Sequence, residues 1–208
     1  MLGGWVAHGH DPGAITVVDP SPPAAMLDLI AEHRVTHVQS ATDADRPDVI
    51  IVAVKPQIID AVLAGLGGLV DENNVLLSVA AGAPLQQLSR PFDNQGQRSI
   101  GVVRTIPNTP SLIGLGMTGC VANAHVSDDQ KQMVTSLLDA IGQVEWVDDE
   151  ALIDAITALS GSGPAYVFHL AEAMAKAGEA AGLPADLALR LAIGTIKGAG
   201  ELLDQSDL

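Results

Sequence analysis

The sequence predicts an α/β protein in which a doubly wound parallel sheet is followed by an all-helical segment. Short apolar runs alternate with stretches of helical periodicity over residues 1–148, which is typical of a parallel sheet with helices on both faces. The runs VIIVAV and VLLSVA are apolar without alternation, as expected of strands buried on two sides. From residue 149 to the end, no strand signal remains. We therefore expect two domains, residues 1–148 and residues 149–208.

The first elements are a short helix and a strand. Leu2, Trp5 and Val6 recur at helical spacing, and Gly9 can end that helix in the left-handed conformation. Residues 14–18 form a short apolar strand, and a helix is expected over residues 22–34. This order is the second half of a strand, helix, strand unit. The sequence thus indicates that the first strand of the sheet is missing.

The rest of the sheet domain continues the alternation. Strands are expected over residues 48–54, 74–80, 99–107, 116–123 and 143–147, and helices over residues 56–66, from Pro84, and after Ser127. Ser127 is a suitable N-cap, and Gly142 lies just past the end of its helix. All strands are expected to join one sheet.

Helices are expected over residues 149–160, 164–183 and 184–205. Pro164 and Pro184 lie at first helical positions, where a missing N–H is tolerated. About three helices in roughly 60 residues bury their own apolar faces poorly. This segment should therefore pack against the sheet domain or against another chain.

Composition limits the partners and the compartment. Ten Lys and Arg against 25 Asp and Glu give a net charge of -15, which disfavours nucleic acid and anionic membranes. The two Trp, one Tyr and two Phe offer few stacking surfaces for bases. The single cysteine, Cys120, cannot form an internal disulfide, and no leader or membrane span is evident. A cytoplasmic protein is expected.

Three stretches could carry chemistry. Lys55 follows a buried strand, and SVAAGAP ends the next strand with small side chains, so a flat ligand could lie at this edge of the sheet. Asn108 and Thr109 form a polar turn between two prolines. The SGSG stretch enters a helix at Pro164, and helix N-termini bind anions. A solvated loop lysine, an ordinary turn and a Ser-capped helix are the structural alternatives.

Other chemistries are disfavoured. His8 with His10, or His33 with His37, could suggest a metal pair, but no Cys or carboxylate completes a ligand set, and we expect no metal. Ser-His-Asp catalysis lacks a G-x-S-x-G elbow. The sequence by itself singles out no catalytic residue.

Taken together and in this order, five stretches resemble pyrroline-5-carboxylate reductase: IIVAVKPQ, SVAAG, RTIPNTP, DEALIDAITALSGSGPAYVF and AAGLP. The resemblance spans essentially the whole chain. It implies a Rossmann-type domain that binds NADPH, with NADH as the alternative, and a helical domain that pairs two subunits into a homodimer or a higher oligomer. It also implies hydride transfer to the C=N carbon of a small cyclic imine, which yields proline.

The resemblance also implies site residues. The cofactor-contacting positions would be Ser21, Ala53, Val54, Lys55, Pro56, Val79, Ala80 and Ala81. The substrate-side positions would be Glu150, Ser160, Gly161 and Ser162. Ser21 would meet the adenosine ribose or its phosphate, whereas an acid at Asp19 favours the free 2′-hydroxyl of NADH.

Two features of the family are absent. No G-x-G-x-x-G follows a first strand, and the family's Ser-Pro-Gly-Gly segment would lie beyond Leu208. We therefore expect a fragment, clipped at both ends and inactive alone. Two other functions stay open: another imine or β-hydroxyacid reductase of similar plan, and a non-catalytic, nucleotide-sensing or structural relative.

Overall fold

The computed structural model describes residues 1–93 and 100–206. It divides the chain into two compact units, Met1–Thr157 and Ala158–Leu208, and each is described by itself below. The predicted strand at residues 99–107 begins at a residue outside the described ranges, and the rest of it is described.

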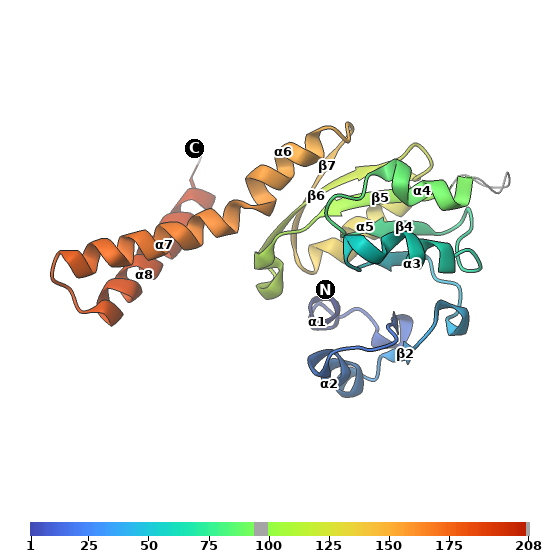
Figure 1. The fold of residues 1–208 in the computed structure, drawn as a ribbon, viewed down its shortest axis with the longest axis horizontal. Helices are drawn as coiled ribbons and strands as arrows, with labels where there is room; N and C mark the ends of the chain where they lie inside the picture. The colour runs from blue at the N-terminus through green and yellow to red at the C-terminus, as the bar shows by residue number, and fades with distance from the viewer. Residues whose placement is uncertain (94–99, 207–208) are drawn as a thin grey trace. The chain divides into compact units, whose positions relative to one another are not determined.

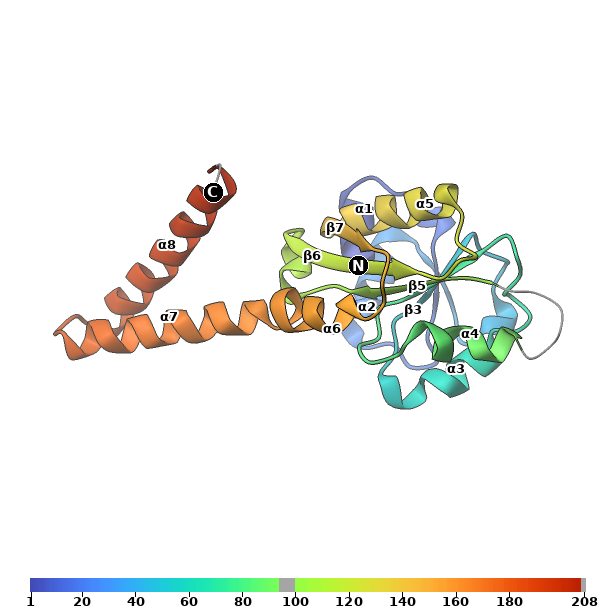
Figure 2. The ribbon, with the colours of Figure 1, turned by 90° about the horizontal axis from the view of Figure 1, so that it is seen from above.

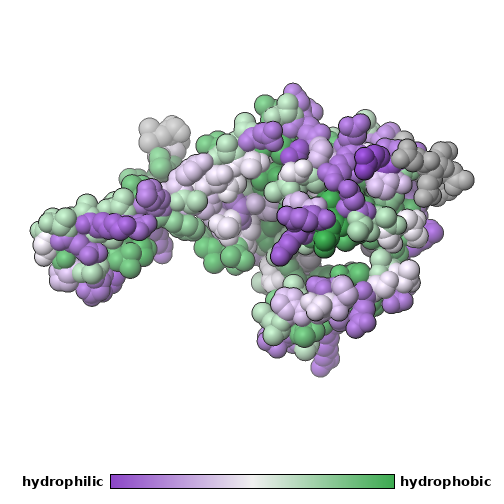
Figure 3. Space-filling view, in the orientation of Figure 1, coloured by the Kyte–Doolittle hydropathy of each residue, from purple (hydrophilic) through white to green (hydrophobic). Residues whose placement is uncertain are grey.

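The first unit contains two sheets. A small sheet pairs β1 (Thr16–Val18) with β2 (Thr36–Val38) in parallel. A larger sheet has the order β3-β4-β5-β6-β7. Its strands are β3 (Val49–Val52), β4 (Val75–Ser78), β5 (Gly101–Ile106), β6 (Gly116–Ala122) and β7 (Gly142–Val147). Within the described residues, β1 and β3 are not hydrogen-bonded to each other. An opening separates the part formed by α2 and β2 from the part formed by α3 (Figure 3).

The larger sheet is parallel except at one pair. β3, β4 and β5 run in the same direction, and β7 is parallel to β6, but β6 is antiparallel to β5. Residues 107–115 alone join β5 to β6 and hold only the short 3₁₀ helix η4 (Thr109–Ile113). Such a short connection cannot make the crossover that parallel neighbours need. The expectation of an entirely parallel sheet is wrong at this pair.

Helices cover both faces of the larger sheet. The helices of this unit are α1 (Leu2–Ala7), α2 (Ala24–His33), α3 (Ile59–Gly65), α4 (Leu85–Asp93), α5 (Asp128–Asp139) and α6 (Leu152–Ile156), with short 3₁₀ turns η1 (Pro12–Ala14), η2 (Ala41–Asp43) and η3 (Pro56–Ile58). α3 and α4 lie on one side of the sheet, and α1 and α5 lie on the other (Figures 1 and 2). The predicted doubly wound arrangement is confirmed.

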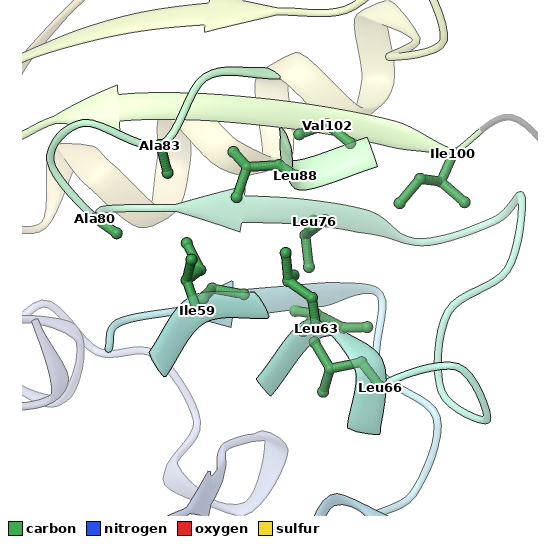
Figure 4. Close-up of a cluster of buried hydrophobic side chains, with 11 residues drawn as sticks. Ile59, Leu63, Leu66, Leu76, Ala80, Ala83, Leu88, Ile100 and Val102 are labelled. Carbon is green, nitrogen blue, oxygen red and sulfur yellow. The ribbon is translucent and has the colours of Figure 1, made fainter. Parts of the chain in front are cut away.

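Strand β4 lies in the centre of this arrangement. Its residues are all buried, and successive side chains of a strand point to opposite faces. Leu76 packs with Ile59, Leu63 and Leu88 under α3 and α4 (Figure 4). Val75 and Leu77 instead pack under α5. Burial on both faces explains why this strand has no alternation in its sequence.

Local signals in the sequence match the ends of several elements. Gly9 has φ +83° just after α1, as expected of a glycine that ends a helix. Ser127 caps α5 in a capping box with Gln130. Gly142 begins β7 at φ +140°, where a Cβ would collide with the backbone of Gly116. A glycine is therefore required at this position.

The second unit is a helical pair with a small core. A π-helix, η5 (Thr157–Gly161), leads into α7 (Gly163–Ala180), which is followed by α8 (Ala185–Asp204). Its buried apolar residues are Ala175, Ala188 and Ala192. Many large apolar side chains are exposed within the unit: Leu159, Tyr166, Val167, Phe168, Leu170, Leu183, Leu189, Leu191, Ile193, Leu202 and Leu203. The helical pattern of the sequence predicts an exposed apolar face that includes Val167, Leu170, Leu187, Leu191 and Ile196, but Leu187 and Ile196 are partly buried. In the described part of the chain, no helix has the length and apolarity needed to span a membrane.

Candidate functional site

The carboxyl ends of β3 and β4 meet at one edge of the sheet. The two strands are parallel, Val52 is aligned with Ser78, and the Val79 amide donates a hydrogen bond to the Val52 carbonyl at 3.2 Å. The chain leaves β3 through residues 53–56 and leaves β4 through residues 79–81. The strand ends that lead to Lys55 and Ala80 therefore lie at one edge of the sheet, and the sequence-based prediction that the two residues line one groove stays a prediction.

The two strand ends differ in exposure. Ala53 and Lys55 are exposed, and within the described residues Lys55 has no hydrogen bond or ion pair. Its backbone is extended and leads into Pro56 at the start of η3. Val54 and Val79 are partly buried, and Ala80 is only 4% exposed. The edge therefore offers a free cation beside an apolar strand end.

The end of β4 is held rigidly. The Ala80 amide donates to the Ser78 hydroxyl at 3.2 Å, and the Thr105 hydroxyl donates to the Ser78 carbonyl at 3.0 Å. Ala81 is exposed, and Gly82 follows at φ +79°. Side chains this small let a planar ring approach the backbone. The edge therefore leaves room for a planar ligand beside the backbone.

Glu150 is connected to this edge through the chain that follows β4. Its Oε1 accepts a hydrogen bond from the Leu85 amide at 2.8 Å, at the start of α4. The same oxygen accepts a hydrogen bond from Nη1 of Arg104 at 2.9 Å. Glu150 also lines a surface hollow with Ser89 and His125. The structure thus brings one predicted substrate-side residue near the end of the predicted cofactor edge.

Sequence reasoning missed Arg104. Its side chain is 8% exposed on strand β5, and a second carboxylate, that of Asp154, lies 3.9 Å from its Nη2. The signal was a single cation in the otherwise apolar stretch GVVRTI. A buried strand tolerates a cation only when an acid pairs with it, so this arginine predicts an acidic partner.

The SGSG stretch lies in the second unit and has an unexpected backbone. Ser160 and Gly161 belong to the π-helix, and Ser162 has helical angles, φ −88° and ψ −19°. The helix predicted at Pro164 is present, because α7 begins at Gly163. The Ser-capped helix entry that was the structural alternative is not formed, because the π-helix runs directly into α7 and the Ser162 side chain makes no capping hydrogen bond. π-helical turns occur often at functional sites.

The turn at Asn108 has a structural use. Its side-chain Oδ1 accepts a hydrogen bond from the Met117 amide at 2.9 Å, and Thr109 begins η4. This contact ties the β5–β6 connection to strand β6. This hydrogen bond therefore supports the interpretation of Asn108 as part of an ordinary structural turn.

Ser21 lies beyond the end of β1, in the small sheet. It is exposed, and its amide donates to Oδ1 of Asp19 at 2.8 Å. The start of α2 follows at Ala24. Asp19 and Ser21 therefore lie between the end of β1 and the start of α2.

Two other chemistries find no support in the described residues. Burial raises the pKa of the Cys120 thiol to about 12, so this cysteine is not a nucleophile near neutral pH. Within residues 1–93 and 100–206, no three His, Cys, Asp or Glu side chains are grouped as metal ligands.

Two family models match parts of the chain. The one described as "Pyrroline-5-carboxylate reductase dimerisation" matches residues 150–208. The one described as "NADP oxidoreductase coenzyme F420-dependent" matches residues 1–82.

Comparisons with individual proteins agree with these matches. The chain is 38% identical over 209 residues to a pyrroline-5-carboxylate reductase of Pseudomonas aeruginosa, covering 100% of this chain and 75% of the relative. It is 40% identical over 164 residues to that of Synechocystis, covering 79% of this chain and 59% of the relative. The solved reductase of Coxiella burnetii has a TM-score of 0.91 and 34% identity, covering 100% of this chain and 76% of that one. A Plasmodium falciparum pyrroline carboxylate reductase with NADP bound has a TM-score of 0.82 and 27% identity, covering 100% and 75%.

Proposed function

The chain belongs to the pyrroline-5-carboxylate reductase family, and on this premise we propose that it serves the reduction of 1-pyrroline-5-carboxylate to proline by a nicotinamide dinucleotide. The observation that carries the proposal is the parallel alignment of Val52 with Ser78. It places two strand ends with small side chains at one sheet edge, which is where ligands bind in open α/β sheets.

The cofactor would be held by the chain's own strand ends. Residues 53–56 and 79–81 would face the dinucleotide, and Lys55 would supply a positive charge for its phosphates. The reduced nicotinamide, when bound, supplies the hydride. Ala81 and Gly82 leave room for the flat ring beside the backbone. The residues present therefore fit a dinucleotide at this edge.

The substrate would be met by Glu150 and by the SGSG stretch. Arg104 and the Leu85 amide both hold Oε1 of Glu150, so this carboxylate is fixed in position before any ligand arrives. Such positioning lowers the cost of reaching the reactive geometry. We propose Ser160, Gly161 and Ser162 as further contacts for the substrate.

We propose that residues 1–148 form a dinucleotide-binding domain and that residues 149–208 form a domain for substrate binding and dimerisation. Support for dimerisation comes from the exposed apolar side chains of α7 and α8, since monomers rarely leave large apolar surfaces in water. A second copy of the chain would cover them. The cytoplasmic location stays a prediction.

The test is an activity assay on a chimera. The segments of the Pseudomonas aeruginosa relative that lie outside its match to this chain are joined to the two ends of the chain. The expected result is oxidation of NADH or NADPH that depends on pyrroline-5-carboxylate and that falls strongly in a folded Glu150→Gln variant, which keeps an acceptor for the Leu85 amide and Arg104 but lacks the charge.

Two results would contradict the proposal. A folded chimera that reduces a β-hydroxyacid or another imine, but not pyrroline-5-carboxylate, would show a different reductase. A folded chimera that binds the nucleotide and reduces nothing would show a nucleotide-sensing relative.

A further inference from the structure

A single wide turn interrupts the helical run that carries the SGSG stretch. α6 ends at Ile156, the π-helix η5 covers Thr157–Gly161, and α7 begins at Gly163. Hydrogen bonds in a π-helix join residues five positions apart, whereas those in an α-helix join residues four positions apart. Such turns are rare and occur mostly as single turns inside α-helices. The turn competes with a continuous α-helix, so it needs a source of support.

The residues of the turn supply little of that support by packing. Ser160, Gly161 and Ser162 are small and partly exposed, and a Cβ at Gly163 would meet no atom within 4 Å. Leu159, the large apolar side chain of the turn, is 78% exposed. Glycines also weaken the preference of this stretch for a regular helix. Packing therefore fixes the backbone weakly here.

Two hydroxyl groups instead hold this part of the chain. Oγ1 of Thr157 donates a hydrogen bond to the Ile153 carbonyl at 2.7 Å, just before the turn. The Tyr166 hydroxyl, on α7, donates to the Ala158 carbonyl inside the turn at 3.2 Å. Long side chains on a helix point back toward its N-terminus, which lets this tyrosine reach a carbonyl eight positions earlier. The bond therefore spans the whole SGSG stretch.

We propose that Tyr166 is a positioning residue for the reaction, because its hydroxyl keeps the turn in the π form and so sets how Ser160, Gly161 and Ser162 face the substrate. The inference rests on the proposed function, which gives those three residues contacts with the substrate. Closing the turn to an α-helix would shift its register by one residue. The side chains that follow would then rotate by about 100° about the helix axis, and the serines would leave their positions.

The exposure of Tyr166 favours this role over a role in the stability of the unit. The side chain is 61% exposed, and its bond to Ala158 is exposed as well. The net effect of one such hydrogen bond shifts a local equilibrium by about twofold to tenfold. A shift of this size selects between two forms of one turn, but it does not decide whether the unit folds.

Hydrogen exchange tests whether the hydroxyl holds the turn. Tyr166→Phe removes the hydroxyl and keeps the ring, and amide exchange is followed by NMR in the isotopically labelled chain. Exchange at residues 159–163 should become about threefold faster or more, while the melting temperature stays within about 2 °C of the wild type. Unchanged exchange at these residues would overturn the inference.

A matched variant controls for the loss of any exposed hydroxyl. The Thr195 hydroxyl donates to the Leu191 carbonyl at 2.8 Å at an exposed position of α8. Thr195→Val therefore removes the same kind of bond outside the SGSG stretch and should leave exchange at residues 159–163 unchanged. Equal acceleration in both variants would attribute the effect to a general loosening of the unit and overturn the role of Tyr166.

Kinetics test whether the turn positions the substrate. In the chimera described above, Tyr166→Phe should lower kcat/KM for pyrroline-5-carboxylate by about threefold or more and leave KM for the dinucleotide unchanged. Thr195→Val should match the parent chimera in both quantities. A merely structural role would instead lower the melting temperature and change both quantities together, and that result would overturn the inference.

The outcomes separate this inference from the proposed function. An active chimera in which Tyr166→Phe leaves kcat/KM for the substrate unchanged would overturn the inference and leave the proposed function standing. A folded chimera that does not reduce pyrroline-5-carboxylate would contradict the proposed function. The exchange comparison would then still confirm or overturn the role of Tyr166 in the turn.

Discussion

Nη1 of Arg104 lies 2.9 Å from Oε1 of Glu150, and the contact joins the centre of strand β5 to the segment that leads into α6. The arginine side chain is 8% exposed and the glutamate side chain 31%. The Leu85 amide donates to the same oxygen. One carboxylate thus connects three elements around the end of β4.

This contact predicts an asymmetric loss of stability. Glu150→Ala leaves the buried guanidinium with only the exposed carboxylate of Asp154, 3.9 Å from its Nη2, and should lower the free energy of unfolding by about 3 kcal/mol. Arg104→Met leaves the more exposed carboxylate and should cost about 1–2 kcal/mol. Urea denaturation measures both. Arg46→Ala is the control, because Arg46 is 70% exposed in its pair with Asp71 and should cost about 1 kcal/mol or less. Equal losses in all three variants would contradict the account.

Because the chain is exposed just after β4, a larger side chain there should block nucleotide binding without unfolding the chain. Ala81→Leu places a larger side chain where the planar ring would approach, so nucleotide affinity should fall about tenfold or more while the melting temperature stays nearly unchanged. Ala64→Leu, at an exposed position of α3, should change neither quantity. Unchanged affinity in Ala81→Leu would remove this edge from the site.

The buried thiol predicts a loss of stability at high pH. Burial raises the pKa of Cys120 from 9.0 to about 12 in the folded chain. The unfolded chain therefore loses the thiol proton first, so the stabilisation is complete below pH 9 and declines as the pH rises toward 12. Comparing urea midpoints of the wild type and Cys120→Ala across this range isolates the effect. Parallel curves for the two proteins would contradict it.

The exposed apolar side chains of the helical unit predict that the chain dimerises. A single charged side chain introduced among them should disrupt the dimer. Leu191 on α8 is 52% exposed within its unit, and Leu191→Glu should convert a dimer into a monomer when molar mass is measured by light scattering. Lys197→Glu alters charge elsewhere on the same helix and should leave the dimer intact. A wild-type chain that is monomeric at high concentration would overturn the dimer.

The order of most elements could be predicted because their signals are local. The apolar run of β4, the cap at Ser127 and the glycine at Gly9 each depend on a few adjacent residues. Strand β2 was missed because Thr36, His37 and Val38 form no apolar run and depend on pairing with β1.

Features that depend on distant residues could not be predicted from local patterns. The reversed direction of β6 follows from the length of the connection before it. The partner of Arg104 lies 46 positions along the chain, and no periodicity points to it. The π-helix follows directly after α6, and the Ser-Gly pattern of its sequence suggests an ordinary helix cap instead.

The most direct test of the central claim is the mapping of amide chemical shifts in the isotopically labelled chain as NADH is added. The account predicts that the changes concentrate at the carboxyl edge of the sheets, at residues 53–55 and 79–82 and at Asp19 and Ser21. Changes centred on the opposite edge, around Asp48 and Asn74, or no saturable change at any residue, would contradict the placement of the cofactor at these strand ends.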